Sequence, residues 1–263
     1  MEYDPDFPSA RGKYREFISN QLSFREIIPI GDEEVENKIH EVFRLQYLKD
    51  VVLARILDES STSIIGSLIL FYNSEILSYI ESNIPFQKKL FSIVSLPDEP
   101  DEKKNEVILF MKQYSQMYKS LPNTYRGDSF KTLCENGLFN ALRFALLCSN
   151  DKTRLDGSEL LVFMLECDKA FVREYLLYED QSPDPDTKDH KSLLSIISEI
   201  VNSDPNINIQ LLNVDIMRVI LDTSSTGLES FSGFIEVFYL FSLTFFCVLL
   251  FFFIPYFYKF CHL

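Results

Sequence analysis

The sequence has no tryptophan among its 263 residues, and only eight glycines, five cysteines and three histidines. The glycines form neither GxGxxG nor GxxxxGK[ST], so neither of these phosphate-binding loops is indicated. The chain is also short of basic residues, with 25 Lys and Arg against 39 Asp and Glu and a formal charge of −14. Nucleic-acid binders need a positively charged surface, so no nucleic-acid partner is expected.

The residues that could take part in catalysis or metal binding form no recognisable motif. The histidines make no HExxH pair and the cysteines no CxxC pair, so a zinc site is not indicated. An acidic segment, 184–189, has Asp189 at the sixth position, where a calcium loop needs glycine. We therefore predict no catalytic, cofactor-binding or metal residue, leave the binding residues unassigned, and interpret the chain as a binding or scaffold module rather than an enzyme. The residues considered were His40, His190, His262, Cys134, Cys148, Cys167, Cys247 and Cys261.

Helical spacing of apolar residues dominates the body, residues 1–229. Asp32 precedes acidic residues and an apolar pattern, which is typical of a helix N-cap. Pro85 can begin another helix, and Asn136-Gly137 is a stop signal. Asn73-Ser74 suggests a break between two helices, and loops are expected at 96–102 and 179–190.

This pattern predicts ten or eleven helices and no hairpin. Helix pairs recur about every 35–45 residues, the period of armadillo and HEAT arrays. We expect an all-α fold, an armadillo/HEAT-like solenoid in which each layer buries the next, with a C-terminal hydrophobic helix. A long helical bundle would fit the body nearly as well.

The phenylalanines are concentrated in a C-terminal segment, 230–263. Eleven of the 24 lie between Phe231 and Phe260, and residues 237–258 contain no charge. As a helix, this stretch would be roughly 33 Å long, enough to cross a bilayer as a tail anchor. A buried core helix and translated T-rich noncoding DNA are the two alternatives.

Several stretches of the body resemble the central domain of the protein phosphatase 4 regulatory subunit 3 family, also called SMEK or falafel. The block at 38–57, KIHEVFRLQYLKDVVLARIL, is specific, and its ending looks fungal. The resemblance extends over about residues 2–222. Its other stretches are EYDPDFP (2–8), REFISNQLSFREIIPI (15–30), SLILFYNSEIL (67–77), DSFKTLCENGLFNAL (128–142), FVREYLL (171–177) and QLLNVDIMRVILD (210–222).

The resemblance implies an armadillo/HEAT-like, non-catalytic scaffold without cofactor. Its implied partners are the phosphatase 4 catalytic subunit, which holds the metals, and the other regulatory subunit of that complex. The implied location is the nucleus and cytoplasm. The alternative is a tail-anchored membrane adaptor that uses the same helical body.

Two departures from the family pattern stand out. Family members begin with an EVH1/PH-like domain, which the resemblance does not extend to here. Because no polar capping unit precedes the first expected helix, we expect an array that is entered part-way through. GFIEVFY at 233–239 still resembles the next helix of the family, and the resemblance then stops inside the Phe-rich run. We expect a truncated gene or a reading frame that continues into an intron.

The tail-anchor hypothesis makes a direct prediction. If residues 237–258 span a bilayer, the endogenous protein stays in the membrane pellet after carbonate extraction. Release into the soluble fraction, or a transcript with a splice junction at Tyr239 that restores further helices, would contradict it.

Overall fold

The structure is a computed structural model that describes residues 14, 16, 17, 26–122, 130–181 and 191–221. Every regular element in these ranges is helical, and they contain no strand. The all-α prediction is therefore confirmed for the described part of the chain. The predicted hydrophobic helix at 237–258 and the rest of the segment 230–263 lie outside the described residues.

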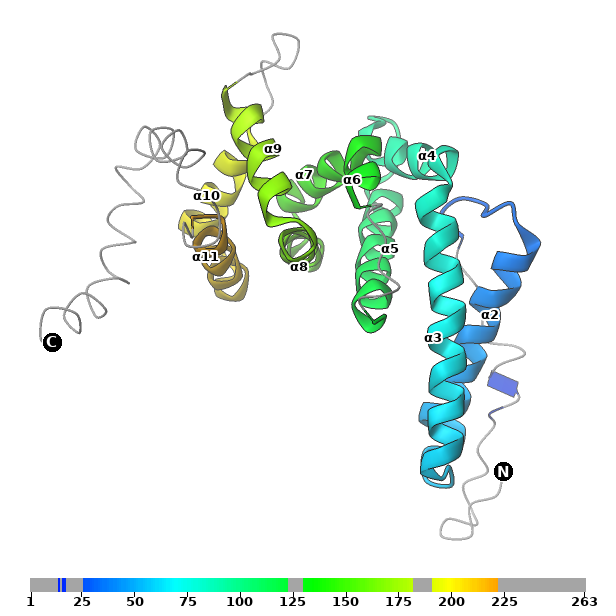
Figure 1. Ribbon diagram of the computed structural model, residues 1–263. Helices are drawn as coiled ribbons and strands as arrows, with labels where there is room; N and C mark the ends of the chain where they lie inside the picture. The colour runs from blue at the N-terminus through cyan, green and yellow to red at the C-terminus, as the bar shows by residue number, and fades with distance from the viewer. Residues whose placement is uncertain (1–13, 15, 18–25, 123–129, 182–190, 222–263) are drawn as a thin grey trace, which may run out of the picture. The chain divides into compact units, whose positions relative to one another are not determined.

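The helices form two compact units, one up to Asn140 and the other from Ala141 onward (Figure 1). The first unit contains α2 (Glu33–Tyr47), η1 (Leu48–Val52), α3 (Glu59–Ser82), α4 (Ile84–Ser95), α5 (Asp101–Ser120), α6 (Phe130–Leu133) and η3 (Cys134–Leu138). α7 (Phe139–Leu147) begins at the boundary. The second unit continues with α8 (Asp151–Cys167), α9 (Lys169–Gln181), α10 (Leu193–Ser203) and α11 (Ile207–Leu221).

Polar caps determine where several helices begin, as expected. The Asp32 carboxylate accepts hydrogen bonds from the backbone N–H groups of Glu34 and Val35 at 3.0 and 3.2 Å. Asn83 caps α4, with Pro85 in the first turn. These side chains satisfy backbone donors that a helix start leaves without partners.

Two local predictions were wrong. α3 runs unbroken through Asn73 and Ser74, because Asn73 is buried mid-helix and the Ser74 hydroxyl donates to the Phe71 carbonyl within the same helix. α9 also extends to Gln181, into the loop expected from residue 179. Glu179 is held there because its carboxylate accepts from Arg143 and from the backbone N–H of Leu193.

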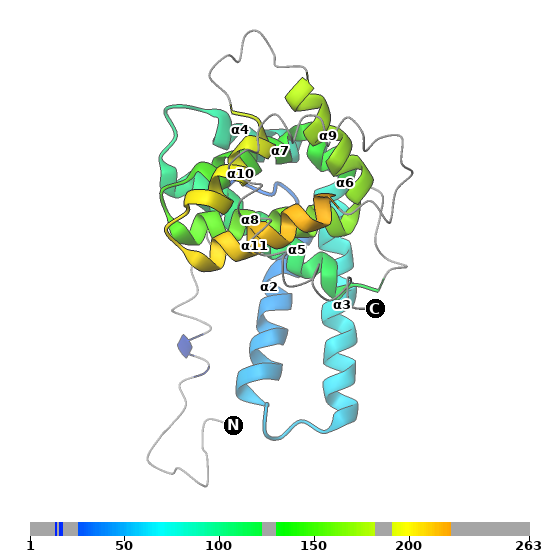
Figure 2. The same cartoon turned by 90° about the vertical axis from the view of Figure 1, so that its left-hand side faces the viewer.

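The core of the first unit is built around α3 and α4. α2 runs alongside α3 in both views (Figures 1 and 2). Gln87 of α4 is completely buried, and its Nε2 donates to the Ile80 and Glu81 carbonyls at the end of α3. Its Oε1 accepts from Asn136 Nδ2 at 2.7 Å, so one side chain links α3, α4 and η3.

α3 differs from its neighbours in being both long and apolar. By length and composition it is the one helix in the described part of the chain that could cross a bilayer, with a mean hydropathy of 1.3. Helices of soluble proteins also meet this criterion. Only 28% of the most apolar 18-residue stretch of α3 is buried. Much of the apolar surface of α3 therefore has no cover from the described residues.

The second unit packs α8 against α11 and α9. Asn213 of α11 donates to the Ser158 hydroxyl of α8 at 2.9 Å, and both side chains are fully buried. A Cβ at Gly157 would lie 2.6 Å from the Ala145 Cβ. The absence of a side chain at Gly157 is therefore what lets α7 and α8 approach closely.

Gly137, in the predicted stop, is required for two reasons. Its φ of +124° lies where L-residues are strained. A Cβ there would also lie 2.8 Å from the Phe91 Cβ, in the buried core. The break between η3 and α7 thus depends on glycine, whereas a methyl group added at Gly66 in α3 would have no neighbouring atom within 4 Å.

We predict opposite effects for the two Gly→Ala changes. Gly137→Ala should lower the free energy of unfolding by about 1–3 kcal/mol or more, because it adds backbone strain and a steric clash with Phe91. Gly66→Ala should raise it by about 0.5–1 kcal/mol, because alanine is the better helix former. Urea denaturation of both variants measures this, and equal effects would contradict the assignment.

Candidate interaction site

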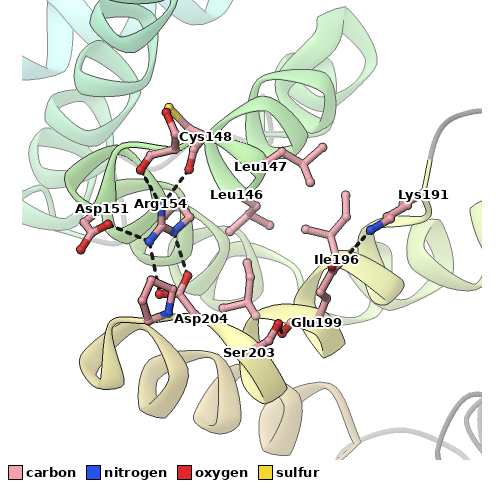
Figure 3. Close-up of a pocket in the computed structure, with 13 residues that line it drawn as sticks. Leu146, Leu147, Cys148, Asp151, Arg154, Lys191, Ile196, Glu199, Ser203 and Asp204 are labelled. Atoms are coloured by element: carbon pink, nitrogen blue, oxygen red, sulfur yellow. Dashed lines mark hydrogen bonds and ion pairs between the residues drawn. The ribbon is translucent and has the colours of Figure 1, made fainter.

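A hollow of about 370 Å³ lies in the second unit, where the end of α7 and the start of α8 meet α10 (Figure 3). Its lining combines apolar side chains with five side chains of Asp, Glu, Lys or Arg. The lining residues are Leu146, Leu147, Cys148, Ser149, Asp151, Arg154, Lys191, Ile196, Glu199, Ile200, Ser203, Asp204 and Pro205.

Arg154 organises one side of the hollow. Its Nε donates to Asp204 Oδ2 at 2.8 Å, and its Nη2 donates to Asp151 and Asp204 at 2.8 and 3.3 Å. Its Nη1 donates to the carbonyls of Cys148 and Ser149, both at 2.9 Å, just past the end of α7. All five N–H donors of the guanidinium are therefore used, so Arg154 has a structural role here.

Asp204 is the buried partner of Arg154 and ends α10. It also accepts from the backbone N–H of Asn206 at 2.8 Å, just before α11. The hydrogen bonds with Asp204 raise the pKa of Arg154 above its already high ordinary value. The pair thus holds the ends of α7 and α10 and the starts of α8 and α11 together.

A second network positions the other side of the hollow. Arg143 of α7 pairs with Glu179 of α9 and donates to the Lys191 carbonyl. Burial lowers the pKa of Arg143. The Lys191 ammonium pairs with Glu199 at 2.6 Å on the rim, where both side chains are about half exposed (Figure 3).

The hollow has an apolar floor and a polar rim. Leu146, Ile196 and Ile200 are buried, while Leu147 at the edge is 55% exposed. Such an arrangement suits the insertion of an apolar side chain from a partner, with polar contacts around it. The described residues contain no group of three His, Cys, Asp or Glu side chains that could hold a metal ion.

The residues considered from the sequence do not gather at this site, except for one cysteine. Cys148 lies in the lining, and Cys134, Cys148 and Cys167 form no disulfide within the described part of the chain. His40 lies on α2, with its Nε2 3.9 Å from Glu36. The acidic segment 184–189 and the remaining candidates, His190, His262, Cys247 and Cys261, lie outside the described residues.

Sequence reasoning missed the residues that build the hollow. In the sequence, Asp204 stands in a Ser-Asp-Pro segment that is typical of a helix end, and Arg154, its partner, is 50 residues away. No local pattern marks such a pair. The one hint in the sequence was an arginine shortly after the helix start at Asn150, near enough to reach the preceding helix end.

Comparisons with known proteins give a consistent result. The family model for phosphatase 4 regulatory subunit 3 matches residues 1–246. An uncharacterized protein of Schizosaccharomyces pombe is 34% identical over 210 residues, covering 77% of this chain and 24% of that protein. No solved structure matches the chain significantly.

Two named relatives are similar over more of the chain. Suppressor of Mek1 from Dictyostelium discoideum is 31% identical over 232 residues, covering 88% of this chain and 22% of the relative. Serine/threonine-protein phosphatase 4 regulatory subunit 3 from Drosophila melanogaster is 26% identical over 247 residues, covering 92% and 25%. The chain therefore spans about a quarter of the length of these relatives.

Removing Arg154 should destabilise the second unit strongly. Arg154→Met leaves the buried Asp204 carboxylate without its counter-charge, which typically costs about 3–5 kcal/mol. Arg218→Met is the matched control, because Arg218 forms an exposed pair with Asp215, and it should change stability by less than about 1 kcal/mol. Chemical denaturation of both variants measures the loss of stability. Similar losses in the two variants would contradict a structural role for Arg154 and its partners Asp151 and Asp204.

Proposed function

Since the chain belongs to the phosphatase 4 regulatory subunit 3 family, we propose that it acts as a non-catalytic scaffold in the phosphatase 4 complex. The observation that carries this proposal is the family match over residues 1–246. The name of the Drosophila relative, a regulatory subunit of phosphatase 4, points the same way. In this role the chain binds the enzyme and contributes no catalytic residue.

The proposed partners are the phosphatase 4 catalytic subunit and the other regulatory subunit of its complex. The chain would help to direct serine/threonine dephosphorylation, and the catalytic metals would belong to the partner. We propose the nucleus and cytoplasm as its location, the compartments that the family resemblance implies.

We further propose that the helices continue one armadillo/HEAT-like array. This is supported inside each unit by contacts between helices that are close neighbours in the sequence, such as α3 with α4 and α10 with α11. Stacking of this kind is typical of helical repeats, in which each layer buries the apolar face of the next.

The hollow in the second unit is the proposed contact for one of these partners. Its buried floor offers apolar contact, and the exposed Leu147 and the Lys191–Glu199 pair form an edge that a partner can cover. Interfaces commonly combine a buried apolar centre with such a polar rim.

Co-purification tests the proposal. The full chain should bring down the phosphatase 4 catalytic subunit of the same organism at low salt. Leu147→Arg should weaken the association about tenfold or more, because it places a charge at the edge of the apolar floor. Quantitative pull-down with purified subunits measures both effects.

Leu211→Arg is the control, since Leu211 is similarly exposed, at 46%, but lies on α11 outside the hollow. It should leave the association within about twofold. Absence of any association would overturn the proposed function. Association that Leu147→Arg and Leu211→Arg affect equally would overturn only the assignment of the hollow.

A further inference from the structure

The first unit carries an apolar stripe on α3. Ile64, Leu68 and Phe71 follow at intervals of four and three residues, so they share one side of the helix. They are 67%, 37% and 54% exposed. The opposite side of the same helix, with Ile69, Asn73, Ile76 and Ile80, is the buried side. The stripe thus points away from the core of its own unit.

The part of α3 that carries the stripe lies toward the connection with η1, away from α4. Figures 1 and 2 both show the paired α2 and α3 helices extending away from α4 and α6 of the same unit. Ser60 and Ser67 flank the stripe and are exposed, so no long side chain on that flank would hold a second helix away. Contiguous exposed apolar residues of this kind mark interaction sites more often than scattered single ones do.

The charge next to the stripe is negative. Glu75 continues the same helix side, four residues after Phe71. Its Oε2 lies 3.2 Å from Lys38 Nζ, but this oxygen is buried and accepts no hydrogen bond within the described residues. Lys38 is shared, since it also donates to Glu34 at 2.6 Å. One ammonium therefore serves two carboxylates at the end of the stripe.

Further carboxylates extend these acidic surroundings. A hydrogen bond with Glu41 raises the pKa of Tyr72, the residue after Phe71. Asp58 and Glu59 precede the stripe at the start of α3, and Asp and Glu outnumber Lys and Arg between residues 33 and 82. An acidic surface repels anionic lipid and a second copy of itself, and it attracts a basic partner.

We propose that Ile64, Leu68 and Phe71 form a docking surface for a basic amphipathic helix of a protein partner. From Ile64 to Glu75 the surface is roughly 16 Å long, or about three helical turns. The partner helix places apolar residues at i, i+3 or i+4 and i+7 on the stripe, as in other helix-in-groove contacts, and its Lys or Arg side chains meet Glu75, which continues the same side of α3. This site is independent of the hollow and of the proposed phosphatase partner.

Binding of a defined probe tests the proposal. The probe is an 18-residue helical peptide of Leu and Lys with all leucines on one side, titrated into the full chain by fluorescence anisotropy. We expect saturable one-to-one binding that weakens as salt rises. A Leu/Glu peptide with the same pattern, and a Leu/Lys peptide of scrambled order, should each bind at least tenfold more weakly.

Variants locate the site. Leu68→Glu should weaken binding at least tenfold, and Phe71→Ala, which removes apolar surface without adding charge, should weaken it about threefold or more. Leu109→Glu on α5 is the matched control, because Leu109 is 41% exposed, and binding should stay within twofold. Circular dichroism confirms that each variant keeps its helical content.

Several outcomes would overturn the proposal. They are equal effects of Leu68→Glu and Leu109→Glu, equal binding of the Leu/Glu peptide, or no binding at all. Leu68-dependent binding to phosphatidylserine vesicles without peptide binding would show a membrane face instead. A dimer in sedimentation that Leu68→Glu dissociates would show a second copy, and a loss of stability in Leu68→Glu without peptide binding would show that this chain covers its own stripe.

Discussion

No helix can cover its own apolar side chains, and burial against a neighbouring helix is the constraint on which each unit depends. Each fully buried Leu, Ile or Phe contributes roughly 1.5–3 kcal/mol, so the pairing of helices dominates the stability of the unit. Leu90 and Phe91 in α4 and Leu160 and Leu161 in α8 are almost completely buried in this way. Where the described residues supply no neighbour, as along the outer side of α3, apolar surface remains exposed.

Apolar burial alone does not determine how the ends of neighbouring helices are arranged. Polar side chains do this. Gln87 and Arg154 do this in similar ways in the two units: Gln87 donates to two carbonyls in the last turn of α3, and Arg154 donates to two carbonyls just past the end of α7. Carbonyls at a helix end have no partner inside the helix, so these donors remove a cost that apolar contact cannot remove. The hollow in the second unit exists because Arg154 and Asp204 hold its helix ends in this fixed arrangement.

The parts of the fold that local signals determine could be predicted from the sequence. Asp32, Pro85 and Gly137 mark helix ends through backbone geometry and capping, which act over a few residues. The prediction at Asn73 was wrong, because burial of the surrounding helix stabilises it more than a cap at Asn73 would stabilise a break. Arg154 and Asp204 could not be paired, since no local pattern links residues 50 positions apart, and apolar spacing along α3 did not show which side faces the core.

The division of the chain into two compact units has a consequence for how the chain is made. Unit one is complete at Asn140, and partners in unit two, such as Ser158 and Asn213, are 55 residues apart. Domains generally fold as units during synthesis. Once the ribosome has released the residues up to Asn140, the helices of the first unit can therefore assemble while the rest of the protein is still being translated.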